Sequence, residues 1–181
     1  MALTSPGDTM NINDLIKLKR LSNYAKLVKK MFKLIGIKQE EKIKVKGHLT
    51  ISELKTGKIL FEKDNLVVDT GLALLADRLN SDSQSFLTHI AIGSDTTPAD
   101  PSQTTLVNEF IRNPIGSYST PGPVFTATTI FLDFEANGVW GEVGLFNDPT
   151  AGTMFNRITV SFTKTSAIGV QVQFSVTFSR G

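Results

Sequence analysis

Carboxylates are the residues in this chain that come nearest to a catalytic arrangement. Asp133, Glu135 and Glu142 belong to neighbouring predicted strands and could approach each other as the two acids of a glycosidase do. Such an enzyme also needs aromatic surfaces for its sugar, and Trp140 is the one candidate beside them. Paired acids at strand ends are common in β proteins, so this pattern does not favour a hydrolase.

Other catalytic or metal-binding patterns are weaker still. His48 and His89 each lie within a strand pattern and lack the second histidine of an HExxH site. The chain has no cysteine, which removes disulfides, thiolate ligands and cysteine nucleophiles. Gly141 and Gly144 are not followed by the helix of a dinucleotide-binding loop. No Ser-His-Asp spacing stands out, although a triad is recognised by geometry. We expect no enzyme activity, no cofactor and no metal site.

The charge of the chain is divided unevenly. Residues 1–47 hold eleven Lys and Arg against four Asp and Glu, a net charge of +7. The remainder holds eight against thirteen, a net charge of −5. A basic arm on a mildly acidic body indicates two parts with different tasks. We place the arm, with a flexible lead, at residues 1–42 and the β domain at residues 43–181.

The arm is predicted to contain an amphipathic helix that starts near Asn11 or Asn13 and ends at Gly36. Its apolar face is formed by residues at spacings of three and four: Leu18, Leu21, Ala25, Val28, Phe32 and Ile35. Its opposite face carries Lys19, Lys26, Lys29, Lys30 and Lys33. We expect Leu18, Leu21, Val28, Phe32, Ile35, Lys19, Lys26 and Lys30 to bind a partner.

Three uses of this helix stay open. In the first, its apolar face packs on the body or on a sister helix. In the second, the helix inserts into a groove of a partner protein and anchors the chain there. Alternatively, its lysines meet an anionic surface, either a membrane or a nucleic acid. Nucleic acid is the weakest of these, because Arg20 is the one arginine among the eleven basic residues and lysine lacks the bidentate guanidinium fork.

From Ile43 onward the hydrophobic pattern changes to the period of two that is typical of strands. Strands or hairpins are predicted over residues 43–63, 66–68, 124–134, 141–147, 152–162 and 170–178, and a short helix over residues 70–80. Glu142 is expected on the solvent side of its strand. Short strands separated by turns indicate a mainly β fold, a β-sandwich of jelly-roll type with one short internal helix.

Four blocks of the sequence resemble a family of small β-sandwich virion structural proteins of tailed bacteriophages. The blocks are DTGLALLADRL, THIAIGSDTTPADPSQTTLVNEFIR, GVWGEVGLFND and GTMFNRITVSF, which follow one another in this order within residues 69–162. The resemblance covers about residues 69–181 and leaves the basic helix outside. Members of the family are head decoration, tail-fibre or baseplate components. The resemblance implies a virion part that is assembled in the host cytoplasm and self-associates, with a trimer favoured, and it implies no catalytic residue or cofactor.

Within the second block, Glu109 and Arg112 are three residues apart, a spacing that lets them pair if the segment is helical. In the resembling family these positions belong to a leucine, glutamate and arginine motif. We therefore expect a structural salt bridge, either between the two residues or to a neighbouring subunit. Exposure of both side chains to solvent at a loop-to-strand junction is the alternative.

Together these observations favour a capsid decoration (cement) protein that binds neighbouring shell subunits through its arm. The alternative is a tail fibre or baseplate adaptor, in which the helix bundles with sister copies and loops 94–104 and 117–123 face a host ligand. No signal peptide opens the sequence, and the longest apolar run, residues 72–76, is far too short to span a membrane.

Overall fold

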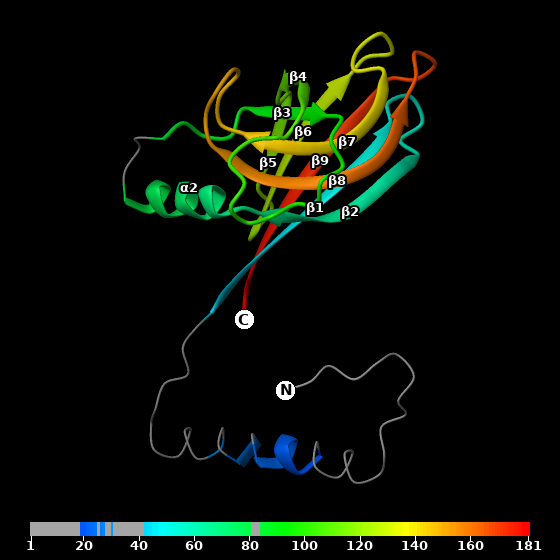
Figure 1. Cartoon of the computed structure of the whole chain (residues 1–181). Coiled ribbons are helices and arrows are strands. Elements are labelled where there is room, and N and C mark those ends of the chain that lie inside the picture. Colours follow the sequence, from blue (N-terminus) through cyan, green and yellow to red (C-terminus); the bar gives the residue numbers. More distant parts are fainter. Residues whose placement is uncertain (1–18, 25, 28–29, 31–41, 81–83) are drawn as a thin grey trace. The chain divides into compact units, whose positions relative to one another are not determined.

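The computed structural model describes residues 19–24, 26–27, 30, 42–80 and 84–181 (Figure 1). The chain divides into two compact units, Met1–Lys42 and Ile43–Gly181. In the first unit, residues 19–24, 26–27 and 30 are helical and their side chains are exposed. The division falls where the hydrophobic pattern of the sequence changes to the period of two that is typical of strands.

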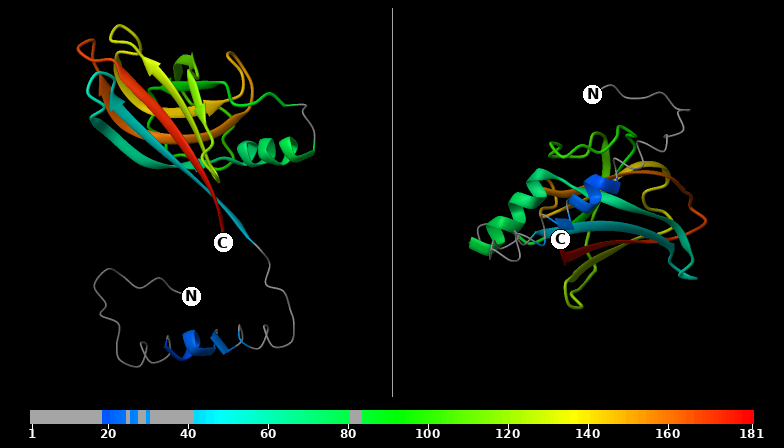
Figure 2. Two further views of the ribbon diagram at one scale, coloured as in Figure 1. Left: turned by 180° about the vertical axis from the view of Figure 1, so that it is seen from behind. Right: turned by 90° about the horizontal axis from the view of Figure 1, so that it is seen from below.

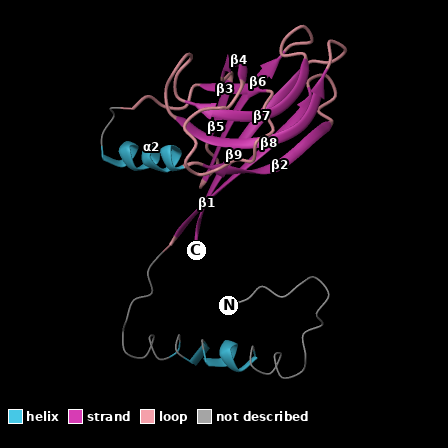
Figure 3. Cartoon of the chain, in the orientation of Figure 1, coloured by secondary structure: helices cyan, strands magenta, loops and turns pink. Residues whose placement is uncertain are grey.

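The second unit, the body, is mainly β, which confirms the expected class (Figure 3). Its strands are β1 Ile43–Glu53, β2 Ile59–Val67, β3 His89–Gly93, β4 Glu109–Pro114, β5 Ser117–Ser119, β6 Val124–Phe131, β7 Gly138–Phe146, β8 Met154–Lys164 and β9 Val170–Arg180. One helix, α2 Asp69–Asn80, joins β2 to β3 and lies where a short helix was predicted. The segment 117–123, expected to be a loop, begins with the edge strand β5.

The strands form one antiparallel nine-stranded sheet in the order β4-β3-β7-β8-β2-β1-β9-β6-β5. The two edge strands, β4 and β5, are consecutive in the chain and are separated by Ile115 and Gly116. The sheet therefore curls until β4 approaches β6, the neighbour of the other edge strand, and the Thr129 hydroxyl of β6 donates to the Pro114 carbonyl of β4 at 2.7 Å. A jelly-roll sandwich consists of two packed sheets, whereas these strands form one continuous sheet. The jelly-roll sandwich therefore stays a prediction.

The main core lies inside the curl. On β9, Val172 and Phe174 are buried while Gln173 between them is partly exposed, as the alternation of the sequence predicted. Trp140 of β7 and Phe131 of β6 meet edge to face in the same core, with ring centroids 5.4 Å apart. The strand predicted over residues 124–134 is shorter, because the chain turns after Phe131.

A second, smaller core forms on the outer side of the sheet, where residues 94–108 cover β3, β7 and β8. Leu106 of this loop packs with Ala91 and Phe146. Helix α2 lies at one end of the body and approaches β8 so closely that a Cβ on Gly71 would overlap the Phe155 carbonyl. The hairpin turns β1–β2, β6–β7 and β8–β9 gather at the other end (Figures 1 and 2).

Candidate binding surfaces

The described part of the arm presents an exposed helix. Lys19, Leu21, Lys26 and Lys30, four of the residues predicted to bind a partner, are helical and exposed. Leu21 is 66% exposed, and the neighbouring Tyr24 and Leu27 are 71% and 64% exposed. The other predicted partner-binding residues lie outside the described residues: Leu18, Val28, Phe32 and Ile35.

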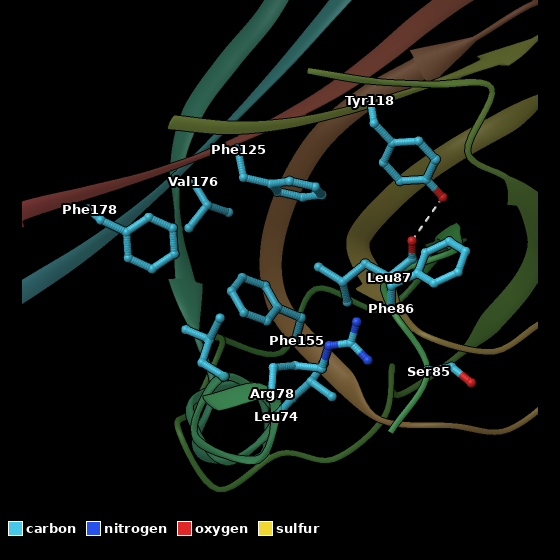
Figure 4. A pocket seen from close by; sticks show the side chains of 11 residues that line it. Leu74, Arg78, Ser85, Phe86, Leu87, Tyr118, Phe125, Phe155, Val176 and Phe178 are labelled. Atoms are coloured by element: carbon cyan, nitrogen blue, oxygen red, sulfur yellow. Dashed lines mark hydrogen bonds between the residues drawn. The ribbon is translucent and has the colours of Figure 1, made fainter. Parts of the chain in front are cut away.

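An apolar pocket lies in the body beside α2 (Figure 4). Its volume is about 280 Å³. It is lined by Leu74, Leu75 and Arg78 of α2, by Ser85, Phe86 and Leu87, and by Tyr118, Phe125, Phe155, Val176 and Phe178 of four strands. Leu74, Phe155 and Val176 also belong to the main core, so the pocket is a place where that core opens to the surface.

The polar groups at the pocket are few. The Tyr118 hydroxyl donates to the Leu87 carbonyl at 2.8 Å, and burial raises the pKa of this phenol. Arg78 Nη1 donates to the Gln84 carbonyl at 2.7 Å. Because the hydroxyl already has its partner and most of the lining is hydrocarbon, a group that enters the pocket must be apolar.

At the other end of the body, residues 132–137 form the turn between β6 and β7, which we call the tip. Lys164 is buried beneath it and donates from Nζ to the Asp133 carbonyl at 3.1 Å and to Asn137 Oδ1 at 3.0 Å. Burial lowers the pKa of Lys164, while Asp133 and Glu135 oppose this shift. A lysine that reaches from β8 therefore holds the two ends of the tip together.

Further hydrogen bonds order the tip itself. The Leu132 amide donates to Glu135 Oε2 at 2.7 Å, and Trp140 Nε1 donates to the Ala136 carbonyl at 2.7 Å. Ala136 adopts the left-handed conformation with φ at 52°, which the surrounding bonds stabilise. The result is a rigid turn on which Phe134 is 73% exposed.

Glu142 was expected to face solvent, and this prediction is wrong. Its side chain is fully buried and accepts from Arg157 Nε at 2.8 Å, from the Asn108 amide at 2.7 Å and from the Val107 amide at 3.0 Å. The residue does lie on the outer side of β7. That side is covered by residues 94–108 instead of by water, so the carboxylate is enclosed with a counter-charge.

Arg157 is the second half of this arrangement and was not singled out from the sequence. Its side chain is fully buried, and its Nη1 donates to the Thr97 carbonyl at 2.9 Å and to Gln103 Oε1 at 3.1 Å. One ion pair thus holds both limbs of the 94–108 loop against the sheet. The sequence feature that could have indicated this packing is the pair of glycines Gly93 and Gly141. A Cβ on either of them would overlap atoms of Glu142 or of the loop.

The structure pairs Glu109 with Arg112. Arg112 Nε donates to Glu109 Oε1 at 2.8 Å and Nη2 donates to Oε2 at 2.6 Å, a bidentate bridge. The segment is the strand β4 and not a helix. A register shift opposite Ile92 and Gly93 inserts Phe110 as an extra residue, which turns positions three apart to the same face.

Arg112 also joins β4 to the turn between β7 and β8. Its Nη1 donates to the carbonyls of Asp148 and Ala151, both at 2.8 Å, and its guanidinium lies 3.8 Å from the centre of the Phe146 ring. The guanidinium thus donates four hydrogen bonds within one chain. The expected bridge is therefore intramolecular and anchors an edge strand.

The histidines occupy separate surroundings. His48 Nδ1 lies 2.8 Å from Asp64 on the exposed face of β1 and β2. His89 Nδ1 lies 2.7 Å from the Thr88 hydroxyl, and burial, with a further contribution from Arg112, lowers its pKa against the influence of Asp148. Within the described residues, no group of three or more His, Asp or Glu side chains is placed to hold a metal ion.

The three carboxylates considered for catalysis also have different environments. Asp133 and Glu135 belong to the tip, whereas Glu142 is enclosed with Arg157. Among the helical residues that the structure describes, none forms a segment long and apolar enough to cross a membrane.

Comparison with known proteins returns no match: no family model, no curated protein and no solved structure is similar enough to the chain to indicate kinship.

Proposed function

We propose that the chain is a structural protein of a tailed-phage virion and acts as a capsid decoration protein that binds neighbouring shell subunits. The observation that carries this proposal is the exposed apolar side of the arm helix, where Leu21, Tyr24 and Leu27 follow each other at spacings of three and are all more than 60% exposed. Large apolar side chains gathered on one helix are typical of a segment that docks on a partner.

The distribution of charge supports the same role. The arm side of the chain carries a net charge of +7 and the remainder −5, and Lys19, Lys26 and Lys30 are exposed on the described helix. Such a helix suits a partner with an acidic surface around an apolar groove. Opposite charges steer the encounter and fix its orientation, while the apolar contacts supply most of the affinity.

The body suits a binding role better than a catalytic one. Its buried charged groups hold loops in place: Glu142 and Arg157 fasten residues 94–108, and Lys164 fastens the tip. The resemblance of the four sequence blocks to virion proteins points in the same direction. In this proposal the protein needs no cofactor, is assembled in the host cytoplasm, folds as a jelly-roll-like sandwich and self-associates, with a trimer favoured.

A tail fibre or baseplate adaptor is the second candidate. The rigid 94–108 loop favours it, because a surface loop held by a buried ion pair is a suitable scaffold for recognition of a host ligand. In that role the loop would face outward and the arm would bundle with its sister copies.

Co-sedimentation with phage particles that lack this protein tests the proposal. The full chain is expected to bind the heads, and deletion of residues 1–40 is expected to abolish binding. The full-chain variant with Leu21→Ser and Leu27→Ser should bind at least about tenfold more weakly. Asn23→Ser on the same helix is the matched control and should bind like the wild type.

Undiminished head binding by the deleted chain would overturn the anchoring role of the arm. Loss of host adsorption, with head binding unaffected by any of these changes, would favour the fibre or baseplate role instead.

A further inference from the structure

Two uncovered apolar features lie at opposite ends of the body. The apolar pocket lies beside α2 (Figure 4). The tip lies among the hairpin turns at the other end of the body (Figures 1 and 2). We propose that they are the two halves of one contact, in which the tip of one copy inserts Phe134 into the apolar pocket of a second copy. This inference names the surface for the self-association proposed above, and it does not depend on what the arm binds.

The pocket has the right size for this occupant. An apolar cavity of about 150 Å³ lined by Leu, Ile and Phe is large enough for a benzene ring. The pocket, at about 280 Å³, therefore has room for the ring of Phe134 together with a second apolar group. Leu132 on the same tip is 43% exposed and can supply that group.

The chemistry of the pocket matches as well. Phe125, Phe155 and Phe178 line it, and aromatic rings pack well against an incoming aromatic ring in edge-to-face or offset contacts (Figure 4). The Tyr118 hydroxyl and the Arg78 guanidinium already donate to the Leu87 and Gln84 carbonyls, and Ser85 is exposed, so the pocket does not require a polar ligand. An apolar side chain from a second copy would fill the pocket, where the main core is open to the surface.

Charge gives the contact a direction. Phe134 is flanked by Asp133 and Glu135, whereas Arg78 is the one charged residue among the described residues that line the pocket. A tip with acidic flanks is attracted to a pocket with a basic residue, and it is repelled by a second tip. The contact therefore joins tip to pocket, and not tip to tip.

The tip is also prepared for docking before it meets a partner. Lys164 and Trp140 bond its backbone from below, so little conformational freedom is left to lose when Phe134 is buried. A second copy is favoured over an unrelated partner because this chain carries both the complementary pocket and the complementary tip. Two copies related by a two-fold axis make the contact twice and close as a dimer. Any other arrangement leaves one pocket and one tip unused, so the contact repeats and either closes into a ring, such as a trimer, or extends into a filament.

Two full-chain variants test this contact. Phe134→Ser removes the anchor, and Ser85→Trp fills the pocket from an exposed lining position, so neither change removes a core side chain. The control is Val107→Ser, which removes an apolar side chain of comparable exposure, 53%, from the 94–108 loop. Thermal unfolding of each variant confirms that it is folded.

Sedimentation velocity over a range of concentrations gives the readout. The wild type and Val107→Ser should form species larger than a monomer, and each of the two variants alone should associate at least about tenfold more weakly. An equimolar mixture of Phe134→Ser and Ser85→Trp should form a dimer and nothing larger, because one intact tip then meets one intact pocket.

A wild type that stays monomeric throughout, a Phe134→Ser variant that assembles like the wild type, or a mixture that forms no dimer would each overturn the proposal. None of these outcomes changes the expected binding to phage heads, so a failure of the self-contact is distinguishable from a failure of the virion role.

Discussion

Arg157 Nε donates to Glu142 Oε2 at 2.8 Å, and both side chains are completely buried between the sheet and the 94–108 loop. The pair is diagonal across β7 and β8, because Gly144 is the residue directly opposite Arg157 and Glu142 lies two positions further along. Gly144 leaves room for Leu106 to pack beside the pair. The loop is thus fastened by a charged contact and an apolar contact next to each other.

Removal of one partner of this ion pair should be far worse than removal of both. Arg157→Met leaves the Glu142 carboxylate buried without its counter-charge and should lower the free energy of unfolding by about 3–5 kcal/mol. The double variant Glu142→Leu with Arg157→Met should recover a large part of this loss, since no buried charge is left. Urea denaturation measures both, and a double variant that is no more stable than the single one would contradict this account.

The glycines around the pair give a second prediction. A Cβ on Gly141 would overlap the backbone oxygens of Ser94 and Asp95, so Gly141→Ala should displace the loop and lower stability by about 1–3 kcal/mol. Gly116→Ala is the matched control, because its nearest neighbour would be 3.8 Å away. Equal thermal midpoints for the two variants would show that the loop tolerates the displacement.

Much of the fold follows from local patterns, and the long-range contacts do not. The alternation along β9 and the spacing of Leu72, Leu75 and Leu79 suffice to predict a strand and a helix. The rule that polar residues of a strand face water failed at Glu142, because a loop distant in the sequence covers that side of the sheet.

The site residues show the same limit. The pairing of Glu109 with Arg112 depends on a register shift between β3 and β4, which no pattern within one strand contains. The apolar pocket is assembled from a helix, a connecting segment and four strands, so its lining could not be recognised before the topology was known.

His89 should make stability depend on pH. Burial, followed by the Arg112 guanidinium, lowers its pKa in the folded state below the ordinary value of 6.5. The unfolded chain therefore binds this proton more readily, and the free energy of unfolding should fall as the pH decreases from 6.5 through the lowered pKa. His89→Gln should show a smaller fall over the same range in urea titrations at several pH values. If the free energy of unfolding of the wild type and of His89→Gln changed equally with pH, His89 would not be the source of the pH dependence.

Asn156 offers a chance to increase stability. Its side chain is fully buried, and neither its amide nitrogen nor its amide oxygen has a hydrogen-bond partner among the described residues. Asn156→Leu, which is similar in shape and faces the main core beside Leu145, should leave stability unchanged or raise it by about 1 kcal/mol. A clear loss of stability by calorimetry would mean that the amide makes interactions that the fold requires.

The pairing of β1 with β9 places Ile43 opposite Arg180, so the first and last strands of the body are neighbours in the middle of the sheet. During synthesis, β1 leaves the ribosome long before β9, the strand that it needs on one side, and the sheet cannot close until β9 has emerged. Such sequence-distant pairing slows folding and leaves strand edges open to other chains in the meantime. The position of β1 beside β9 therefore leaves one edge of β1 unpaired, and open to other chains, until β9 has been synthesised.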